Sequence, residues 1–202
     1  LNHNTFLGNS AGMNAVPQQG NMMSNLLLGA RAGMNGYIGS NNVILQNATA
    51  DTTLGNANWG VSGNIAIGGN AAVYSDNNVV IGNGADSAPN TIGTSDIDDE
   101  TKGENQSGNM ILAGSGNTIS NIGGKKVQTN SILNGTNVTV GGSSESKDNF
   151  LANVKGVTLN GTRNVILASE LDSEDASQSI YCRNSTIINS TSFALSSNTQ
   201  LN

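Results

Sequence analysis

The sequence has few of the residues on which most globular cores depend. Aromatic residues make up 3% of the 202 positions and charged residues 11%, with two prolines, one histidine and one cysteine. So few rings argue against a conventional sandwich or barrel core, and the single Cys182 has no partner for an internal disulfide. No apolar run approaches the roughly 18 residues of a membrane span. Because the net charge is −6 and the basic residues are scattered, apart from the pair Lys125–Lys126, we expect no nucleic-acid binding and no membrane insertion.

Glycine and asparagine are abundant instead, with 26 and 33 copies respectively. Glycine costs a helix roughly 1 kcal/mol relative to alanine, and asparagine competes for its own backbone. This composition excludes long helices, coiled coils and helical bundles. Isoleucine, leucine and valine nevertheless occur in tight clusters, which a disordered chain of this kind would lack.

A five-residue phrase recurs along the chain: asparagine, an apolar residue, any residue, isoleucine or leucine, and a small residue. The strong copies are NTFLG (4–8), NLLLG (25–29), NVILQ (42–46), NIAIG (64–68), NVVIG (78–82), NMILA (109–113), NSILN (130–134) and NVILA (164–168), and weaker ones are NTIG (90–93) and NFLA (149–152). The second and fourth places share the strand period and point to one face. The fourth place is therefore predicted to fill the core, with Leu7, Leu28, Leu45, Ile67, Ile81, Leu112, Leu133 and Leu167.

Short strands separated by turn-forming linkers indicate an all-β fold. Coils of about 14 to 22 residues are typical of a parallel β-roll or β-solenoid, in which stacked coils bury continuous aliphatic rows. The asparagine before each strand tolerates left-handed backbone, and its amide can form a ladder with the copy above. The glycine after each strand permits a tight corner.

The array divides into two halves. Residues 1–94 carry the phrase with glycine at its end, and residues 95–108 are acidic and aperiodic, which indicates an excursion loop. In residues 109–202 alanine or asparagine replaces that glycine, and shorter units follow one another, as where NSILNGT runs into NVTVGG. A step near seven residues predicts strands that follow one another around a smaller solenoid or an intertwined β-prism.

The phrases NIAIGGNA and NVVIGNGA resemble the head repeats of YadA-like trimeric autotransporter adhesins, and NTFLGNSAG and NLLLGARAG resemble a variant common in phage tail-fibre proteins. The second half, with KGVTLNGTRNVIL and NSTIINSTS, is more similar to fibrous phage appendages. The resemblance implies a parallel β-roll, a homotrimer, an extracellular fibre and a role in attachment.

Candidate catalytic and metal-binding groups are few. His3 is the only histidine and has no nucleophile elbow around it, so we assign no catalytic residue. Acidic residues gather in two segments, one with Asp96, Asp98 and Asp99 and one in 169–179. They favour solvated loops over a glycan-cleaving carboxylate pair or a calcium site, since no EF-hand spacing is present. We assign no metal and no cofactor.

Receptor contact is the remaining candidate role. Exposed rings can stack on sugars or anchor proteins, so Trp59 and Tyr74 are candidate contact residues. Asp96, Asp98 and Asp99 of the excursion loop are the other candidate contact residues. We expect a non-enzymatic segment of a trimeric fibre on a virion or cell surface, whose partners are its own copies and a host surface protein or glycan. A phage tail fibre is favoured, an adhesin head is the alternative, and a glycan-cleaving tailspike is a further one. An ice-binding solenoid is disfavoured because no regular Thr-x-Thr ladder is visible.

Overall fold

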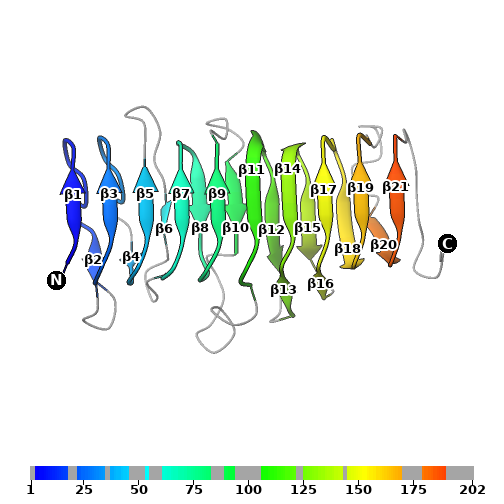
Figure 1. Ribbon diagram of the computed structural model, residues 1–202, viewed down its shortest axis with the longest axis horizontal. Coiled ribbons are helices and arrows are strands. Elements are labelled where there is room, and N and C mark those ends of the chain that lie inside the picture. Colours follow the sequence, from blue (N-terminus) through cyan, green and yellow to red (C-terminus); the bar gives the residue numbers. More distant parts are fainter. Residues whose placement is uncertain are drawn as a thin grey trace.

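The computed structural model describes residues 3–17, 22–34, 37–45, 53–54, 61–82, 89–93, 106–121, 125–142, 145–169 and 179–189. Every regular element of these residues is a β-strand. The described residues form no helix long and apolar enough to cross a membrane. The predicted parallel β-solenoid is confirmed, because all strand pairings are parallel and join strands of successive coils (Figure 1).

One side of the solenoid is a ten-stranded sheet that runs its whole length. Its strands, in spatial order, are β1 (Thr5–Leu7), β3 (Leu26–Leu28), β5 (Val43–Leu45), β7 (Ile65–Ile67), β9 (Val79–Ile81), β11 (Met110–Ser115), β14 (Ser131–Thr136), β17 (Phe150–Ala152), β19 (Val165–Leu167) and β21 (Thr186–Ile188). Every strong copy of the phrase, together with the weaker copy NFLA, forms one of these strands. The repeat therefore located this sheet correctly.

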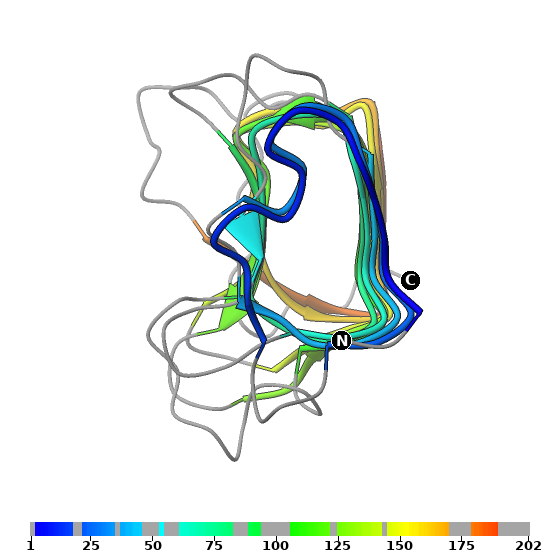
Figure 2. The same cartoon turned by 90° about the vertical axis from the view of Figure 1, so that its left-hand side faces the viewer.

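A nine-stranded sheet forms the second side. It contains β6 (Thr53–Leu54), β8 (Ala71–Val73), β10 (Asn90–Ile92), β12 (Thr118–Asn121), β15 (Thr139–Gly142), β18 (Thr158–Thr162), β16 (Ser146–Lys147), β13 (Val127–Gln128) and β20 (Ser179–Arg183), while β2 (Val16–Pro17) pairs with β4 (Tyr37–Ile38) in a small sheet of its own. The weak copy NTIG is β10, so it belongs to this side and is not a missing strand of the first sheet. Viewed along the long axis, the coils superimpose around one narrow core (Figure 2).

The two halves share these sheets. β9 pairs with β11 in register Val79↔Met110, and β10 pairs with β12 in register Thr91↔Thr118. The short step from NSILNGT to NVTVGG is the step from β14 to β15, which lie on the two sides of one coil. The second half thus continues the solenoid of the first half. The predicted excursion loop 95–108 lies outside the described residues up to position 105.

The corner after the phrase differs between the halves, as the change of residue type predicts. In the first half the corner residues Gly8, Gly29, Gly68 and Gly82 have φ between 106° and 138°, which only glycine adopts readily. In the second half Ala113, Asn134, Asn153, Ala168 and Asn189 have φ between 47° and 59°, the left-handed helical region. Asparagine is tolerated there, while alanine is strained.

A second corner precedes the phrase in every coil. The residue two places before each strand of the ten-stranded sheet has positive φ: His3, Ser24, Asn41, Gly63, Asn77, Gly108, Thr129, Asp148, Arg163 and Asn184. The predicted left-handed backbone is thus present one residue before the asparagine, rather than at it. Six of the ten are glycine, asparagine or aspartate, which favour this conformation. The stacking of the coils imposes it on the other four, so residue type indicates this corner only in part.

Candidate functional site: the outer faces of the two sheets

The third position of the phrase, and not the fourth, fills the core. Phe6 excepted, the side chains at this position are fully or almost fully buried: Leu27, Ile44, Ala66, Val80, Ile111, Ile132, Leu151, Ile166 and Ile187. Isoleucine, valine and leucine from the second sheet, such as Ile92, Ile119 and Leu159, meet them inside. Since alternate residues of a strand face opposite sides, the second and fourth positions point outward.

The prediction that the fourth position forms the core is therefore wrong. Leu7 is 69% exposed, Leu133 is 39% exposed, and Ile81 is exposed to a similar degree. Leu28, Leu45, Ile67, Leu112 and Leu167 are partly exposed on the same outer face. The phrase is apolar at three consecutive positions in most coils, so the period of two does not reveal which phase faces inward.

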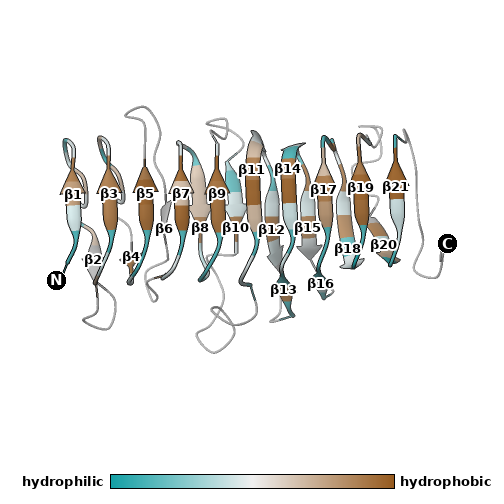
Figure 3. Ribbon diagram, viewed as in Figure 1, coloured by the Kyte–Doolittle hydropathy of each residue, from teal (hydrophilic) through white to brown (hydrophobic). Residues whose placement is uncertain are grey.

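Most strands of the ten-stranded sheet are apolar at consecutive positions (Figure 3), and since alternate residues face opposite sides, the sheet is largely apolar on both faces. Its outer face carries two rows. The fourth position described above is apolar in every strand, and the second position carries Leu26, Val43, Ile65, Val79, Met110, Phe150 and Val165, with Thr5, Ser131 and Thr186 interrupting that row. We call these two rows the aliphatic face. Parallel sheets with apolar residues on both faces are normally covered on both, and a continuous apolar patch of this length marks an interaction surface.

The outer face of the second sheet is polar by contrast. Register places four threonines in one column across adjacent coils, Thr91↔Thr118, Thr118↔Thr139 and Thr139↔Thr158. This column was not visible in the sequence because its members come from coils of different length. A single column is still not the double Thr-x-Thr array that would favour ice binding. The contrast singles out the aliphatic face as the side that needs a cover.

An asparagine ladder fixes the register of the aliphatic face. The side chains of Asn4, Asn25, Asn42, Asn64, Asn78, Asn109, Asn130, Asn149 and Asn164 lie one above another, and all of these except Asn4 are buried. Each Oδ1 accepts the backbone N–H of the next ladder residue, as from Asn42 to Asn25 at 2.8 Å and from Asn78 to Asn64 at 2.8 Å. The predicted amide ladder is confirmed.

Most ladder amides also donate to a backbone carbonyl, which satisfies their remaining polar atoms. Asn25 Nδ2 donates to Gly39 O at 2.9 Å, and Asn164 Nδ2 donates to Cys182 O at 3.0 Å. At the C-terminal end Ser185 takes the ladder position, and its hydroxyl donates to Arg183 O within its own coil. Ser185 is the last ladder position among the described residues.

A shorter ladder of the same design lies on the second side. Asn117 donates its backbone N–H and Nδ2 to Asn90 Oδ1 at 3.2 and 3.0 Å, and Val138 N donates to Asn117 Oδ1 at 3.2 Å. Valine lacks the amide and ends this ladder. The weak phrase NTIG therefore reports the same chemistry on the opposite wall.

The predicted receptor contacts are mostly outside the described residues. Trp59, Asp96, Asp98 and Asp99 lie there, as does the acidic segment 170–178. Tyr74 is described. It directly follows β8, is half-buried, and donates its backbone N–H to Ile92 O at 2.8 Å. Tyr181 lies in β20 and is 37% exposed.

Few titratable groups of the described residues have shifted pKa values. Burial raises the pKa of Asp76, whose Oδ1 accepts the Ser62 N–H at 2.8 Å. Burial also raises the pKa of the Cys182 thiol, which is the usual behaviour of a structural cysteine. Among the described residues no group of three His, Cys, Asp or Glu side chains could hold a metal ion.

Comparison with known proteins adds no relative. The chain matches no protein-family model, no curated protein and no solved structure. The functional argument therefore depends on the two outer faces, the ladder and the resemblance of the repeated phrases.

Proposed function

We propose that this chain is a non-enzymatic segment of a trimeric extracellular fibre that mediates attachment to a host surface, such as a phage tail fibre or a related virion appendage. The observation that carries the proposal is the aliphatic face. It spans all ten strands of the first sheet, while the second sheet presents threonine to its outside. Three copies packed around an axis would cover the three aliphatic faces with one another.

The energetic argument favours self-association. Burial of an exposed leucine or isoleucine contributes about 1.5–3 kcal/mol when complete, and the outer rows offer such residues in nearly every coil. The asparagine ladder and the strand pairing fix the spacing of these rows, so every copy of the chain presents the same rows. A cyclic arrangement uses the same face of each copy and closes without open ends.

Bacterial adhesin heads remain the second candidate class. The phrases of β7 and β9, NIAIG and NVVIG, are those that resemble adhesin head repeats, and their corner glycines Gly68 and Gly82 have the φ values that require glycine. Both classes share the trimeric, attachment-mediating fibre. Their separation therefore depends on the surface recognised and not on the fold.

Molar mass in solution tests the proposal. Light scattering after gel filtration is expected to give about 62 kDa, three times the 20.6 kDa of one chain. Leu28→Asp and Ile81→Asp should each shift the mass toward one chain, because an aspartate cannot be buried there without loss of hydration. Thr118→Asp, at an outward position of the second sheet, is the matched control and should leave the mass unchanged.

Two outcomes would contradict the proposal. A wild-type mass of 20.6 kDa at all protein concentrations would contradict the proposed trimer. Sustained hydrolysis of a polysaccharide by the chain, lost in Asp98→Asn or Asp99→Asn, would replace the non-enzymatic fibre by a glycan-cleaving tailspike.

A further inference from the structure

Basic residues gather along one edge of the second half. Six of the eight lysines and arginines lie between positions 125 and 183, although the chain as a whole has a net charge of −6. The fold brings four of them into neighbouring coils: Lys126, Lys147, Arg163 and Arg183. They belong to or directly flank β13, β16, β18 and β20, which lie side by side toward the lower right of Figure 1.

Backbone pairing fixes how these four residues follow one another. Ser146 N donates to Lys126 O and Arg163 N donates to Lys147 O, each at 2.9 Å, so neighbouring coils place these residues beside one another. Lys147 is in register with Thr162, and Thr162 is in register with Arg183. Lys147 and Arg183 are thus two strand spacings apart, or roughly 10 Å.

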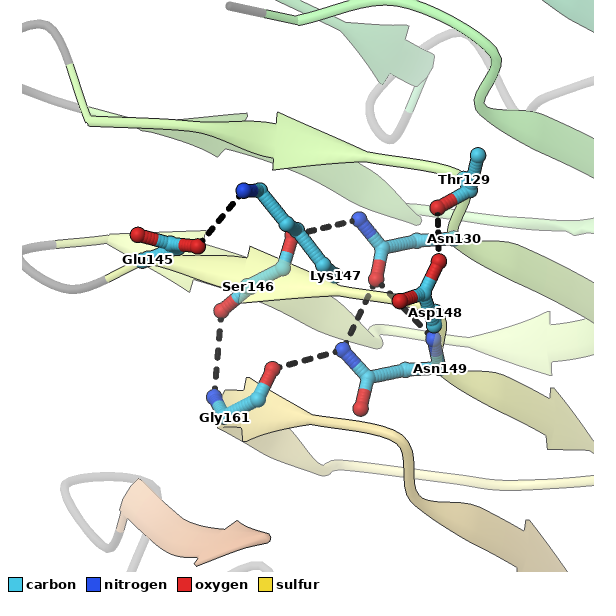
Figure 4. A network of polar contacts seen from close by, with 8 residues as sticks. All are labelled: Thr129, Asn130, Glu145, Ser146, Lys147, Asp148, Asn149 and Gly161. Carbon is cyan, nitrogen blue, oxygen red and sulfur yellow. Dashed lines mark hydrogen bonds and ion pairs between the residues drawn. The ribbon is translucent and has the colours of Figure 1, made fainter. Parts of the chain in front are cut away.

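Two carboxylates accompany the four cations in the described part of this edge. Glu145 Oε1 accepts from Lys147 Nζ at 2.7 Å, and Asp148 accepts from the Thr129 hydroxyl (Figure 4). The pKa of Glu145 is lowered, first by its bond to Lys147 and then by the charges of Lys147, Lys126 and Arg183. The charges of Lys147, Lys126 and Arg183 therefore all reach the Glu145 carboxylate. With four cations and two carboxylates, the described part of this edge has a net positive charge.

An exposed ring adjoins the cations. Tyr181 and Arg183 are two positions apart in β20, so both side chains point to the same outer side. Both are exposed, whereas Ile180, which precedes Tyr181, and Cys182, which lies between Tyr181 and Arg183, are buried in the core. A ring beside cations suits a ligand with an apolar ring face and acid groups.

We propose that this basic edge, composed of Lys126, Lys147, Arg163, Tyr181 and Arg183, binds an acidic polysaccharide. One sugar of the polysaccharide stacks on the Tyr181 ring, and carboxylates of the polysaccharide pair with Lys147 and Arg183. The distance between these two cations is comparable with a disaccharide, and many acidic polysaccharides carry one carboxylate per disaccharide. The inference rests on the proposed attachment function and names the class of ligand. Nucleic acid fits less well, since single strands are held by several stacked rings and the described edge offers one.

Binding of the full chain to hyaluronan, which has one carboxylate per disaccharide, tests the inference. The neutral polysaccharide dextran and single-stranded poly(dT) are the comparison ligands. The double variant Lys147→Gln with Arg183→Gln should weaken hyaluronan binding at least about fivefold, and Tyr181→Ala should weaken it independently. Arg31→Gln, which removes one positive charge from the first half, is the control and should bind like wild type, while Lys147→Gln alone, which also removes one charge, should weaken binding. Binding should also fall as salt rises from about 0.05 to about 0.5 M.

Three outcomes would overturn the inference: no binding of hyaluronan by the wild type, unchanged binding in the double variant, or tighter binding of poly(dT). The double variant leaves the aliphatic face intact, so its mass in solution should equal that of the wild type. A trimer that fails to bind hyaluronan overturns the ligand class and leaves the fibre assignment standing. A monomer that binds it overturns the trimeric fibre and supports the ligand class.

Discussion

Asn130 and Asn149 are joined by side-chain and backbone bonds across one coil spacing. Asn130 Oδ1 accepts from Asn149 Nδ2 at 2.7 Å and from Asn149 N at 3.3 Å, while Asn130 Nδ2 donates to Ser146 O at 2.9 Å (Figure 4). Both residues are buried. One side chain thus satisfies polar groups of the next coil at two places, and the same arrangement recurs along the first sheet.

Substitution of Asn130 by alanine tests this ladder. Asn130→Ala removes the acceptor for Asn149 and the donor to Ser146 O, and each buried group left without a partner costs about 1–3 kcal/mol. We expect the free energy of unfolding to fall by about 2–4 kcal/mol in denaturant titrations. Asn134→Gly is the control. It removes an exposed amide that donates to Asn153 Oδ1, and glycine tolerates the left-handed backbone of position 134. Equal losses in the two variants would show that the ladder contributes no more than a surface amide pair.

Ile132 and Leu133 separate the two faces of the first sheet. Ile132 is fully buried inside the chain, and Leu133 is exposed on the aliphatic face. Ile132→Ala should cost about 2–5 kcal/mol and lower the thermal midpoint at every protein concentration. Leu133→Ala should act chiefly on association, so its effect on the midpoint should depend on protein concentration. Indistinguishable concentration dependence would contradict the assignment of the outer row to a contact between copies.

The sequence predicts the strands of the first sheet and their ladder better than it predicts their orientation. The phrases place asparagine at each strand start, and its amide chemistry leads directly to the ladder. In NLLLG and NVILQ, however, all three strand positions are apolar, and in NIAIG the buried residue is the small Ala66. A shift of one residue exchanges the two faces, so only the second sheet and the closed coil identify the inside.

The basic edge is hidden in the sequence for a different reason. Lys126, Lys147, Arg163 and Arg183 are separated by unequal numbers of residues, because each coil has its own linker length. Only the register between coils brings them together. Tyr181 is hidden likewise, since the phrase marks strands of the first sheet and β20 belongs to the second.

The two kinds of corner make opposite predictions for glycine. Ala113 is exposed with φ 59°, where alanine is strained and glycine is not. Ala113→Gly should therefore stabilise the protein by about 0.5–1 kcal/mol, although glycine usually destabilises strands. Gly82→Ala should destabilise strongly, since its φ is 132° and an added Cβ would lie 2.9 Å from Ala113 Cα. Thermal melting of the two single variants measures both effects, and a less stable Ala113→Gly variant would contradict the strain argument.

Asp76 gives the fold a defined pH dependence. Burial raises the pKa of its carboxyl, while the N–H of Ser62 acts in the opposite direction. A folded-state pKa above the unfolded value means that the folded protein binds the proton more tightly. The stability gained in this way is fully present below the usual value of 3.8 and is lost as the pH rises through the raised pKa.

Substitution of Asp76 by asparagine removes this dependence, because the amide oxygen still accepts the Ser62 N–H and carries no charge to desolvate. At pH about 7 Asp76→Asn should match or exceed the stability of the wild type, by less than about 1 kcal/mol since the site is partly exposed. Below the usual aspartate pKa the difference should vanish. Denaturant midpoints across this range measure it, with Asp148→Asn at an exposed corner as the control. A variant that is less stable than the wild type at neutral pH would show that the charge of Asp76 stabilises its coil.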